Sequence, residues 1–352
     1  MKNLALQRIQ ELQPYSPPLE GRANYDGLLL DFNERTVPPA IELNELFDDI
    51  RPQLYPAFFD LPSKIATYAD VNPEQVMITN GTDQAIDVIV RTFADVDNTV
   101  IIPEPSFAMY RQSARVAGNQ IVSPQYAKND LAFPTQAITE ATDEKTKLVV
   151  ICNPNNPTGT LVPQEEVEEI AAEADGAIVY VDEAYFEFSQ QTSIPLIEKY
   201  PNVIVSRTFS KAFGLAGLRI GYVVARQLYI DEMLKVRGPY DVNQVASYAA
   251  SVALSELDAT SSYRDEVMNE AKPLVEQFFD EHGITFYPSA GNFVLFKPDD
   301  AVLVANMLQQ NGILLRPQNK PPIEDTLRVT IGTVAQMQHF IDVYTAHELT
   351  SD

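Results

Sequence analysis

Lys211 lies in a stretch whose residue types suit covalent chemistry with a phosphorylated ligand. In Ser206–Gly221, hydroxyl residues come just before Lys211, an apolar loop containing glycine follows it, and Arg219 comes eight residues later. A lysine held among apolar groups loses part of its proton affinity by desolvation and can become a nucleophilic amine. Arginine and hydroxyl groups nearby suit a phosphate. The segment therefore predicts a lysine that forms a Schiff base beside a phosphate site.

A second candidate, Asp182, ends the apolar run Ile178–Val181. Because the run is apolar on both faces, it indicates a buried strand, where a carboxylate is costly unless a cationic group lies beside it. An acid at an exposed strand end would need no such partner. The apolar run favours the functional interpretation.

Two further groups follow predicted strands. Asn80–Asp83 open a helical pattern, where free backbone N–H groups could bind an anion, although Asp83 could equally be only a helix cap. In Cys152–Gly159, two prolines and a glycine fix a turn that could aim the amide of Asn156 inward. Cys152 is expected to be a small buried residue and not a nucleophile.

Together these residues describe one ligand, with a phosphate, a group that takes a Schiff base and a basic ring nitrogen that requires an acid. Pyridoxal phosphate has all three features, with Lys211 as its attachment point and Asp182 as the partner of its ring nitrogen.

The elements that must position these residues alternate between short β-branched runs and amphipathic helical stretches, which predicts an α/β domain with a seven-stranded, mostly parallel sheet. Ligands bind such sheets at the carboxyl ends of the strands, where the candidate residues fall. The seven runs are Val76–Thr79, Val100–Pro103, Gln120–Ser123, Leu148–Cys152, Ala177–Asp182, Val203–Ser206 and Ile220–Val224.

After about Tyr240 the pattern changes to a long helical stretch and then to short strands mixed with helices, which predicts a smaller α+β lobe. We expect an N-terminal arm over residues 1–30, lying on a neighbouring subunit, a large cofactor-binding domain over 31–245 and a small C-terminal domain over 246–352.

The composition narrows the class of protein. The 352 residues include 25 Lys and Arg against 49 Asp and Glu, for a net charge of −24, which disfavours nucleic acid and anionic membranes as partners. One cysteine excludes a disulfide framework. Neither a membrane-length apolar run nor a secretory signal is recognisable, so a cytoplasmic protein is expected.

From about Tyr15 to Thr333 the chain resembles the fold-type I pyridoxal-phosphate aminotransferases, and within them the histidinol-phosphate aminotransferase family. The motifs that carry the resemblance are Asn80-Gly-Thr-Asp, Asn155-Asn-Pro-Thr-Gly, Val181-Asp-Glu-Ala-Tyr, Thr208-Phe-Ser-Lys-Ala-Phe-Gly and Leu327-Arg-Val-Thr-Ile-Gly-Thr. The resemblance implies transamination from histidinol phosphate to 2-oxoglutarate, in histidine biosynthesis, by a homodimer.

The resemblance also implies a role for each matching residue. Lys211 would bind the cofactor and shuttle a proton, with Asp182 at the ring nitrogen. Tyr185 and Asn156 would hydrogen-bond the phenolic oxygen, and Phe107, where the family usually has tyrosine, would stack on the ring. The phosphate would be held by Thr82, Asp83, Thr208, Ser210 and Arg219, and by Tyr55 of the other subunit.

For the substrate, the resemblance implies that Arg328 clamps a carboxylate, that Tyr15 and Arg316 lie near the phosphate, and that Asn33 belongs to the site entrance. Around Asn33 the family commonly has Asn-Glu-Asn-Pro, whereas this chain has Asn-Glu-Arg-Thr-Val-Pro. Arg22 and Arg35 could add cations there, although a surface position is favoured for each.

Several alternatives remain open. An aromatic or broad-specificity aminotransferase and a phosphorylated-amino-acid decarboxylase share most of these motifs. A non-catalytic regulatory domain is disfavoured by the acidic charge, and a nicotinamide dehydrogenase by the spacing of Gly214, Gly217 and Gly221. A histidine-based hydrolase is disfavoured because His282, His339 and His347 lie outside every motif.

Overall fold

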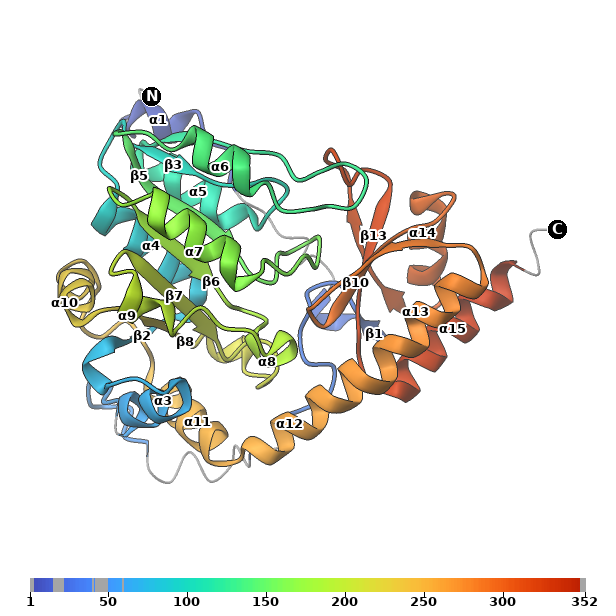
Figure 1. Ribbon diagram of the computed structural model, residues 1–352. Helices are drawn as coiled ribbons and strands as arrows, with labels where there is room; N and C mark the ends of the chain where they lie inside the picture. Colours follow the sequence, from blue (N-terminus) through green and yellow to red (C-terminus); the bar gives the residue numbers. More distant parts are fainter. Residues whose placement is uncertain (1–2, 15–21, 40, 42–49, 59, 349–352) are drawn as a thin grey trace.

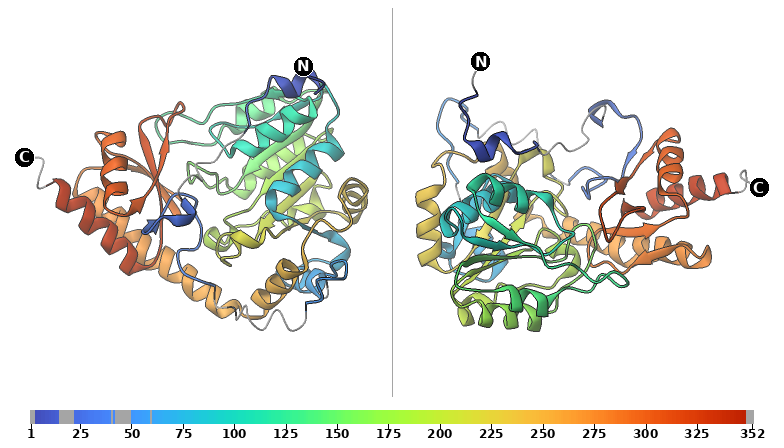
Figure 2. Two further views of the ribbon diagram at one scale, coloured as in Figure 1. Left: turned by 180° about the vertical axis from the view of Figure 1, so that it is seen from behind. Right: turned by 90° about the horizontal axis from the view of Figure 1, so that it is seen from above.

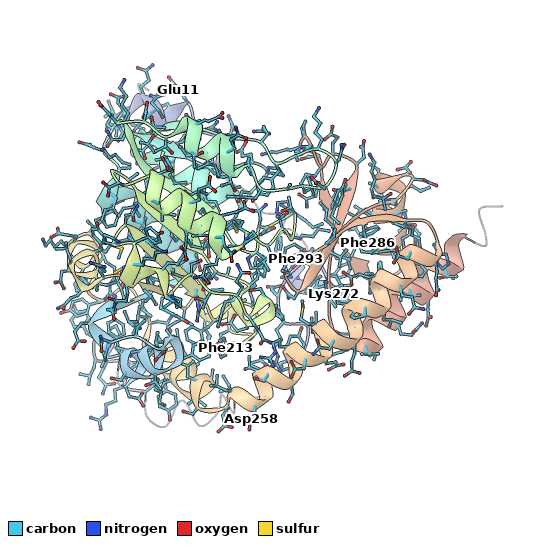
Figure 3. The ribbon with its side chains drawn as sticks, in the orientation of Figure 1. Glu11, Phe213, Asp258, Lys272, Phe286 and Phe293 are labelled. Carbon is cyan, nitrogen blue, oxygen red and sulfur yellow. The ribbon has the colours of Figure 1, made fainter. Side chains whose placement is uncertain are left out.

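The computed structural model describes residues 3–14, 22–39, 41, 50–58 and 60–348. They form a large lobe and a small lobe, which a long helical segment joins along one side (Figure 1). The two lobes have separate hydrophobic cores; Phe213 belongs to the core of the large lobe, and Phe286 and Phe293 belong to that of the small lobe (Figure 3). This arrangement confirms the predicted fold class.

The large lobe contains the predicted seven-stranded sheet, with the strand order β2-β8-β7-β6-β5-β3-β4. β8 runs antiparallel to the other six strands, which are parallel to one another. The strands are β2 (Val76–Thr79), β3 (Thr99–Ile101), β4 (Gln120–Val122), β5 (Thr146–Cys152), β6 (Ile178–Asp182), β7 (Val203–Thr208) and β8 (Gly221–Val224). All seven predicted strands are present, with bounds that differ by at most two residues.

Helices cover both faces of this sheet, which explains why its strands are apolar on both sides (Figure 2). Successive residues of β5 enter opposite cores, with Leu148 and Val150 on one face and Val149 and Ile151 on the other. One face carries α4 (Gly81–Phe93), α5 (Ala108–Ala117) and α10 (Gln227–Val236); the other carries α3 (Leu61–Ala69), α6 (Thr135–Ala141), α7 (Gln164–Glu173), α9 (Leu196–Lys199) and α11 (Gln244–Ser255).

The small lobe is built on an antiparallel sheet with the order β12-β13-β10-β9. Its elements are β9 (Thr285–Tyr287), β10 (Phe293–Lys297), β12 (Arg316–Gln318), β13 (Thr326–Thr330), α13 (Lys272–Glu281), α14 (Ala301–Gln310) and α15 (Val334–Glu348). The connecting segment α12 (Leu257–Glu266) continues through a π-helical turn at Val267–Ala271 into α13.

The described parts of the predicted N-terminal arm contact their own chain. In α1 (Gln7–Gln10), Arg8 Nε donates to the Val116 carbonyl of α5 at 3.0 Å. Further on, β1 (Leu28–Leu29) pairs in parallel with β11 (Ile313–Leu314) of the small lobe. Among the described residues, no helix is long and apolar enough to cross a membrane.

The expected domain boundary at residue 245 falls inside α11. This helix packs against α3, and its residues Ala246–Leu254 contribute to the core of the large lobe. The hydrophobic core of the large lobe therefore extends to the end of α11, and the connecting segment begins at α12.

Candidate active site

A cavity of about 170 Å³ opens at the carboxyl ends of the parallel strands. It brings together four segments that are far apart in the sequence, because parallel strands end at the same edge of a sheet. Ten of the predicted cofactor-binding residues line it: Thr82, Asp83, Phe107, Asn156, Asp182, Tyr185, Thr208, Ser210, Lys211 and Arg219.

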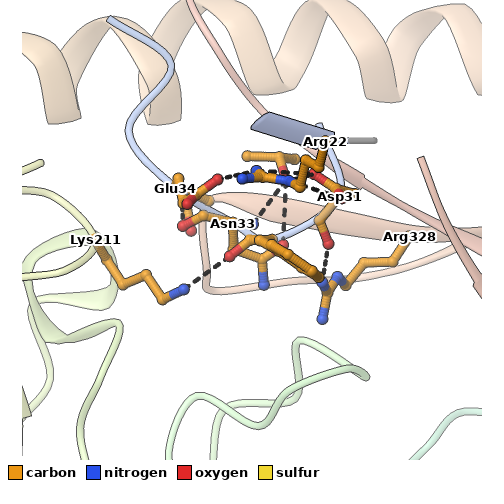
Figure 4. A network of polar contacts seen from close by, with 9 residues as sticks. Arg22, Asp31, Asn33, Glu34, Lys211 and Arg328 are labelled. Atoms are coloured by element: carbon orange, nitrogen blue, oxygen red, sulfur yellow. Dashed lines mark hydrogen bonds and ion pairs between the residues drawn. The ribbon is translucent and has the colours of Figure 1, made fainter. Parts of the chain in front are cut away.

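Lys211 lies between the two lobes at one side of this cavity. Its Nζ donates a hydrogen bond to the Phe32 carbonyl at 2.8 Å (Figure 4). Burial and, to a smaller extent, the positive charge of Arg328 together lower the pKa of Lys211 to about 8, because both disfavour the charged amine. A neutral amine is therefore accessible near physiological pH, as nucleophilic chemistry requires.

Asp182 is buried with two hydroxyl groups and no cation among the described residues. Tyr110 donates to Oδ2 at 2.6 Å, and Ser206 donates to Oδ1 at 3.2 Å. Burial raises the pKa of Asp182 to about 6, although these hydrogen bonds act in the opposite direction. The geometry leaves a buried carboxylate that a cationic ligand in the cavity would stabilise.

Tyr110 was not identified from the sequence. It lies on α5 three residues after Phe107, and the two rings meet edge to face with centroids 5.7 Å apart. The helical spacing places both aromatic residues on the cavity side of α5. An aromatic residue one helical turn after Phe107 was the signal that could have revealed it.

Polar groups gather at the end of the cavity beside α4. Thr208 Oγ1 donates to Ser210 Oγ at 3.0 Å, and Arg219 Nη1 donates to Ser210 Oγ at 3.4 Å. Arg219 also pairs with Asp83 at 3.0 Å. The Thr82 hydroxyl is buried without a hydrogen-bond partner.

The turn before α4 brings its backbone close to the same arginine. Gly81 has φ +71°, and a Cβ at this position would lie 2.6 Å from Arg219 Nη2. Only glycine fits here, because a side chain would meet both backbone strain and the guanidinium group. The guanidinium and the first turn of a helix thus converge on one spot, which is the geometry of an anion site.

On the side facing the small lobe, Tyr185 and Asn156 make contacts with other predicted site residues that the sequence did not predict. Asn33 Nδ2 donates to the Tyr185 hydroxyl at 2.9 Å, and Arg328 donates to Asn156 Oδ1. The Tyr185 hydroxyl is the acceptor in this hydrogen bond, so its own proton remains available for donation to a group in the cavity. Burial raises its pKa well above the ordinary value, so this hydroxyl stays protonated.

The four residues Asp31–Glu34 form a segment between the lobes, which we call the bridging segment. Arg328 and Lys211 both reach this segment (Figure 4): the Asp31 carbonyl accepts from Arg328, and the Phe32 carbonyl accepts from Lys211 Nζ. Asn33 also donates to the Tyr185 hydroxyl. Sequence reasoning found Asn33 but missed the contacts of Asp31 and Phe32, because they are made by backbone carbonyls.

The expectation of surface positions for Arg22 and Arg35 is wrong. Arg22 is only 13% exposed and forms ion pairs with Asp31 and Glu34. Arg35 is half-buried; its Nη1 donates to the Ala212 carbonyl at 3.0 Å, and its guanidinium lies 4.2 Å from the ring centroid of Tyr263. Both side chains are held by protein groups.

Two of the predicted residues that the structure describes, Arg316 and Tyr55, do not line the cavity. Arg316, at the start of β12, places its guanidinium 5.7 Å from the ring centroid of Phe32 and forms no ion pair with another described residue. Tyr55 is 76% exposed and stacks on Tyr240 with ring centroids 4.2 Å apart. Tyr15 lies outside the described residues.

Comparison with known proteins gives a consistent picture. Residues 48–343 match the family of class I and II aminotransferases. The histidinol-phosphate aminotransferase of Ruminiclostridium cellulolyticum is 35% identical over 89% of this chain and 90% of that protein, and the one of Caldanaerobacter subterraneus is 37% identical over 83% of each.

Solved structures share the fold. The histidinol-phosphate aminotransferase of Sinorhizobium meliloti, in complex with pyridoxal-5'-phosphate, superposes with a TM-score of 0.86 at 24% identity, covering 98% of this chain and 99% of that one. The chain therefore belongs to the class I and II aminotransferases, which are pyridoxal-phosphate enzymes, and within them to the histidinol-phosphate aminotransferase family.

Proposed function

We propose that this enzyme transfers the amino group of histidinol phosphate to 2-oxoglutarate, giving imidazole acetol phosphate and glutamate. The proposal is supported by the two curated relatives, which cover more than four fifths of the chain. It also rests on one observation of the site: the guanidinium of Arg316, unpaired among the described residues, lies on the Phe32 ring, whose carbonyl accepts from Lys211.

The residues of the cavity fit pyridoxal phosphate. Asp182 is a buried carboxylate whose described partners are two hydroxyl groups, and it would pair with a protonated ring nitrogen. At the other end, the orphaned Thr82 hydroxyl and the guanidinium of Arg219 would bind a phosphate. When bound, the cofactor supplies an electron-accepting ring that stabilises negative charge on the substrate carbon.

Each side chain has a role that its surroundings support. Lys211 would attach the cofactor through its neutral amine and move a proton on and off the substrate carbon. Asp182 would hold a proton at the ring nitrogen, and Tyr185 would donate its hydroxyl proton to the phenolic oxygen, with Asn156 as a second donor. Phe107 would cover one face of the ring.

Substrate binding would depend on two arginines. Arg328 would clamp the carboxylate of glutamate or 2-oxoglutarate, and Asn33 would border the same space. Arg316, with Tyr15, would hold the phosphate of histidinol phosphate in one half-reaction and the second carboxylate of glutamate in the other. A forked guanidinium suits both anions.

The half-reaction tests this proposal. Histidinol phosphate, phenylalanine, tyrosine and threonine phosphate are each mixed rapidly with the yellow enzyme, and the loss of cofactor absorbance is followed. We expect histidinol phosphate to react with the highest kcat/KM. A faster reaction with phenylalanine or tyrosine would favour an aromatic aminotransferase, and release of carbon dioxide from threonine phosphate would favour a decarboxylase.

Arg316→Ala is expected to weaken transition-state binding of histidinol phosphate by about 2–4 kcal/mol, because a desolvated charge-assisted pair is lost. A neutral aromatic donor should lose much less. The measurement is kcat/KM for both donors. The control is Arg91→Ala, an exposed arginine that pairs with Asp87 and donates to the Val236 carbonyl, and that does not line the cavity. Equal losses for both donors would reject a phosphate-binding role for Arg316.

We further propose a homodimer in which Tyr55 reaches the cofactor phosphate of the other subunit. Tyr55 and Tyr240 stack on each other while both rings remain largely exposed, and the adjacent Leu54 is exposed as well. An exposed apolar patch of this kind suits a subunit interface. Its position outside the cavity of its own chain also supports a role across the interface.

Mixing inactive Tyr55→Phe and Lys211→Ala subunits tests the shared site. After subunit exchange, each mixed dimer would contain one intact site, so activity should recover to about a quarter of the wild-type value if pairing is random. Sedimentation would report the dimer. The absence of recovery, with mixed dimers present and Tyr55→Phe impaired on its own, would show that each site uses its own Tyr55.

A further inference from the structure

Arg22, Asp31 and Glu34 form a compact group of charges, which we call the Arg22 cluster. Arg22 Nη2 lies 3.1 Å from Asp31 Oδ1 and also contacts Glu34 Oε2 (Figure 4). Asp31 is almost completely buried, whereas about a third of the Glu34 side chain is exposed. One cation thus faces two carboxylates, so the cluster carries one net negative charge.

The cation of Arg22 is firmly held in this cluster. Burial would lower the pKa of Arg22, but the hydrogen bonds and charges of Asp31 and Glu34 raise it above its ordinary value. The guanidinium also lies 4.5 Å from the ring centroid of Phe32. Arg22 is therefore committed to protein groups and is not available as a direct substrate ligand.

The cluster lies beside the groups proposed to bind the substrate. Arg22 and Arg316 both lie near the ring of Phe32, and the carbonyl of this residue accepts from Lys211. A cleft of about 480 Å³ is lined by Arg22 and Glu34 and extends to Ser210, which also lines the cofactor cavity. Because Arg22 and Arg316 contact the same ring, an anion bound by Arg316 would lie near the charges of the Arg22 cluster.

We propose that Arg22 is a specificity-determining residue that favours phosphorylated substrates by neutralising Asp31 and Glu34, without touching the substrate itself. This inference rests on the proposed function. Without Arg22, the two carboxylates would repel a dianionic phosphate in a protein whose net charge is already −24. A substrate that has no phosphate would be affected far less.

Two single variants separate this role from a structural one. Arg22→Ala and Glu34→Gln both remove the ion pair between Arg22 and Glu34, but they change the charge of the cluster in opposite directions. Arg22→Ala leaves two net negative charges, whereas Glu34→Gln leaves none. A structural role predicts that both variants impair the enzyme, while the electrostatic role predicts opposite effects on an anionic substrate.

Histidinol phosphate and histidinol are the matched probes, because they differ only in the phosphate. The measured quantity is the ratio of their kcat/KM values in the half-reaction. We expect Arg22→Ala to lower this ratio about tenfold and Glu34→Gln to raise it about threefold. The double variant with Arg22→Ala and Glu34→Gln has the same cluster charge as the wild type, so its ratio should lie within about threefold of the wild-type ratio. The ratio of Arg22→Lys, which keeps the positive charge, should stay near the wild-type ratio.

Salt provides a second readout. In about 0.5 M sodium chloride, screening should reduce the difference between Arg22→Ala and the wild type in the ratio of the two kcat/KM values. The inference is overturned if Arg22→Ala and Glu34→Gln both lower kcat/KM for the two substrates by the same factor, and if the double variant does not restore these values. Thermal unfolding identifies a variant that fails to fold, and the remaining variants still decide the sign of the effect. A wild-type enzyme that does not prefer histidinol phosphate to histidinol would instead reject the proposed function.

Discussion

Lys211→Ala is expected to bind pyridoxal phosphate yet to lose transamination by about four orders of magnitude or more. The change removes both the amine that attaches the cofactor and the group that moves the substrate proton. Borohydride reduction of the wild type, followed by peptide mapping, should place the cofactor on residue 211. Recovery of the label on another lysine would reject the assignment.

The same lysine sets a pH dependence. Because burial lowers the pKa of Lys211 to about 8, the fraction of neutral amine grows as the pH rises towards 8 and levels off above it. The rate at which the cofactor-free enzyme takes up pyridoxal phosphate should follow this curve. Lys199→Ala is a suitable control, since Lys199 is exposed and pairs with Glu168 at the surface.

Asp182→Asn is expected to keep the fold and to lose most of the rate, because a neutral amide no longer favours a proton on the ring nitrogen. The loss should appear mainly in kcat, at about two orders of magnitude or more. Asp87→Asn, which changes an exposed acid of α4, is the control. Turnover near the wild-type value in Asp182→Asn would show that this residue is not the ring partner.

Stability gives a readout for Asp182 that does not depend on activity. Its pKa is about 6 in the folded protein against 3.8 as the ordinary value, so the folded state binds more protons between these values and the wild type loses stability as the pH rises through this window. The cofactor-free Asn variant lacks this loss. Between about pH 3 and a pH above 6, the unfolding free energy of the Asn variant should therefore rise relative to that of the wild type by up to about 3 kcal/mol, measured by denaturant unfolding.

The sequence predicted the sheet well, and ten of the residues that it indicated as cofactor ligands lie together around one cavity, for a physical reason. Strands that are buried on both faces appear in the sequence as continuous apolar runs, and the polar residues that line the cavity come where such runs end. Asp182 and Asn156 could therefore be placed from order along the chain alone. Tyr110 of α5 was not identified, because it contacts Asp182 but belongs to no recognisable motif.

Contacts between sequence-distant groups could not be predicted. The Lys211 amine donates to the Phe32 carbonyl, and because every residue has a backbone carbonyl, the residue type gives no sign of this contact. Glu183, next to Asp182 in the same motif, pairs with buried Arg207 at 2.9 Å instead of entering the cavity. Successive side chains along an extended chain point to opposite sides, so Asp182, the last residue of β6, faces the cavity, and Glu183, the next residue, faces the interior of the lobe.

The bridging segment has a mechanical consequence. Upstream of it, β1 is bonded to β11, and Leu30 accepts from Thr330 of β13, so the chain is fastened to the small lobe immediately before Asp31. The next residues reach across to Lys211 and Tyr185 of the large lobe. A rigid rotation of the small lobe would therefore move the Phe32 carbonyl relative to the Lys211 amine. Because Arg328 donates to the neighbouring Asp31 carbonyl, a movement of Arg328 and the release of Lys211 from its hydrogen bond would be coupled.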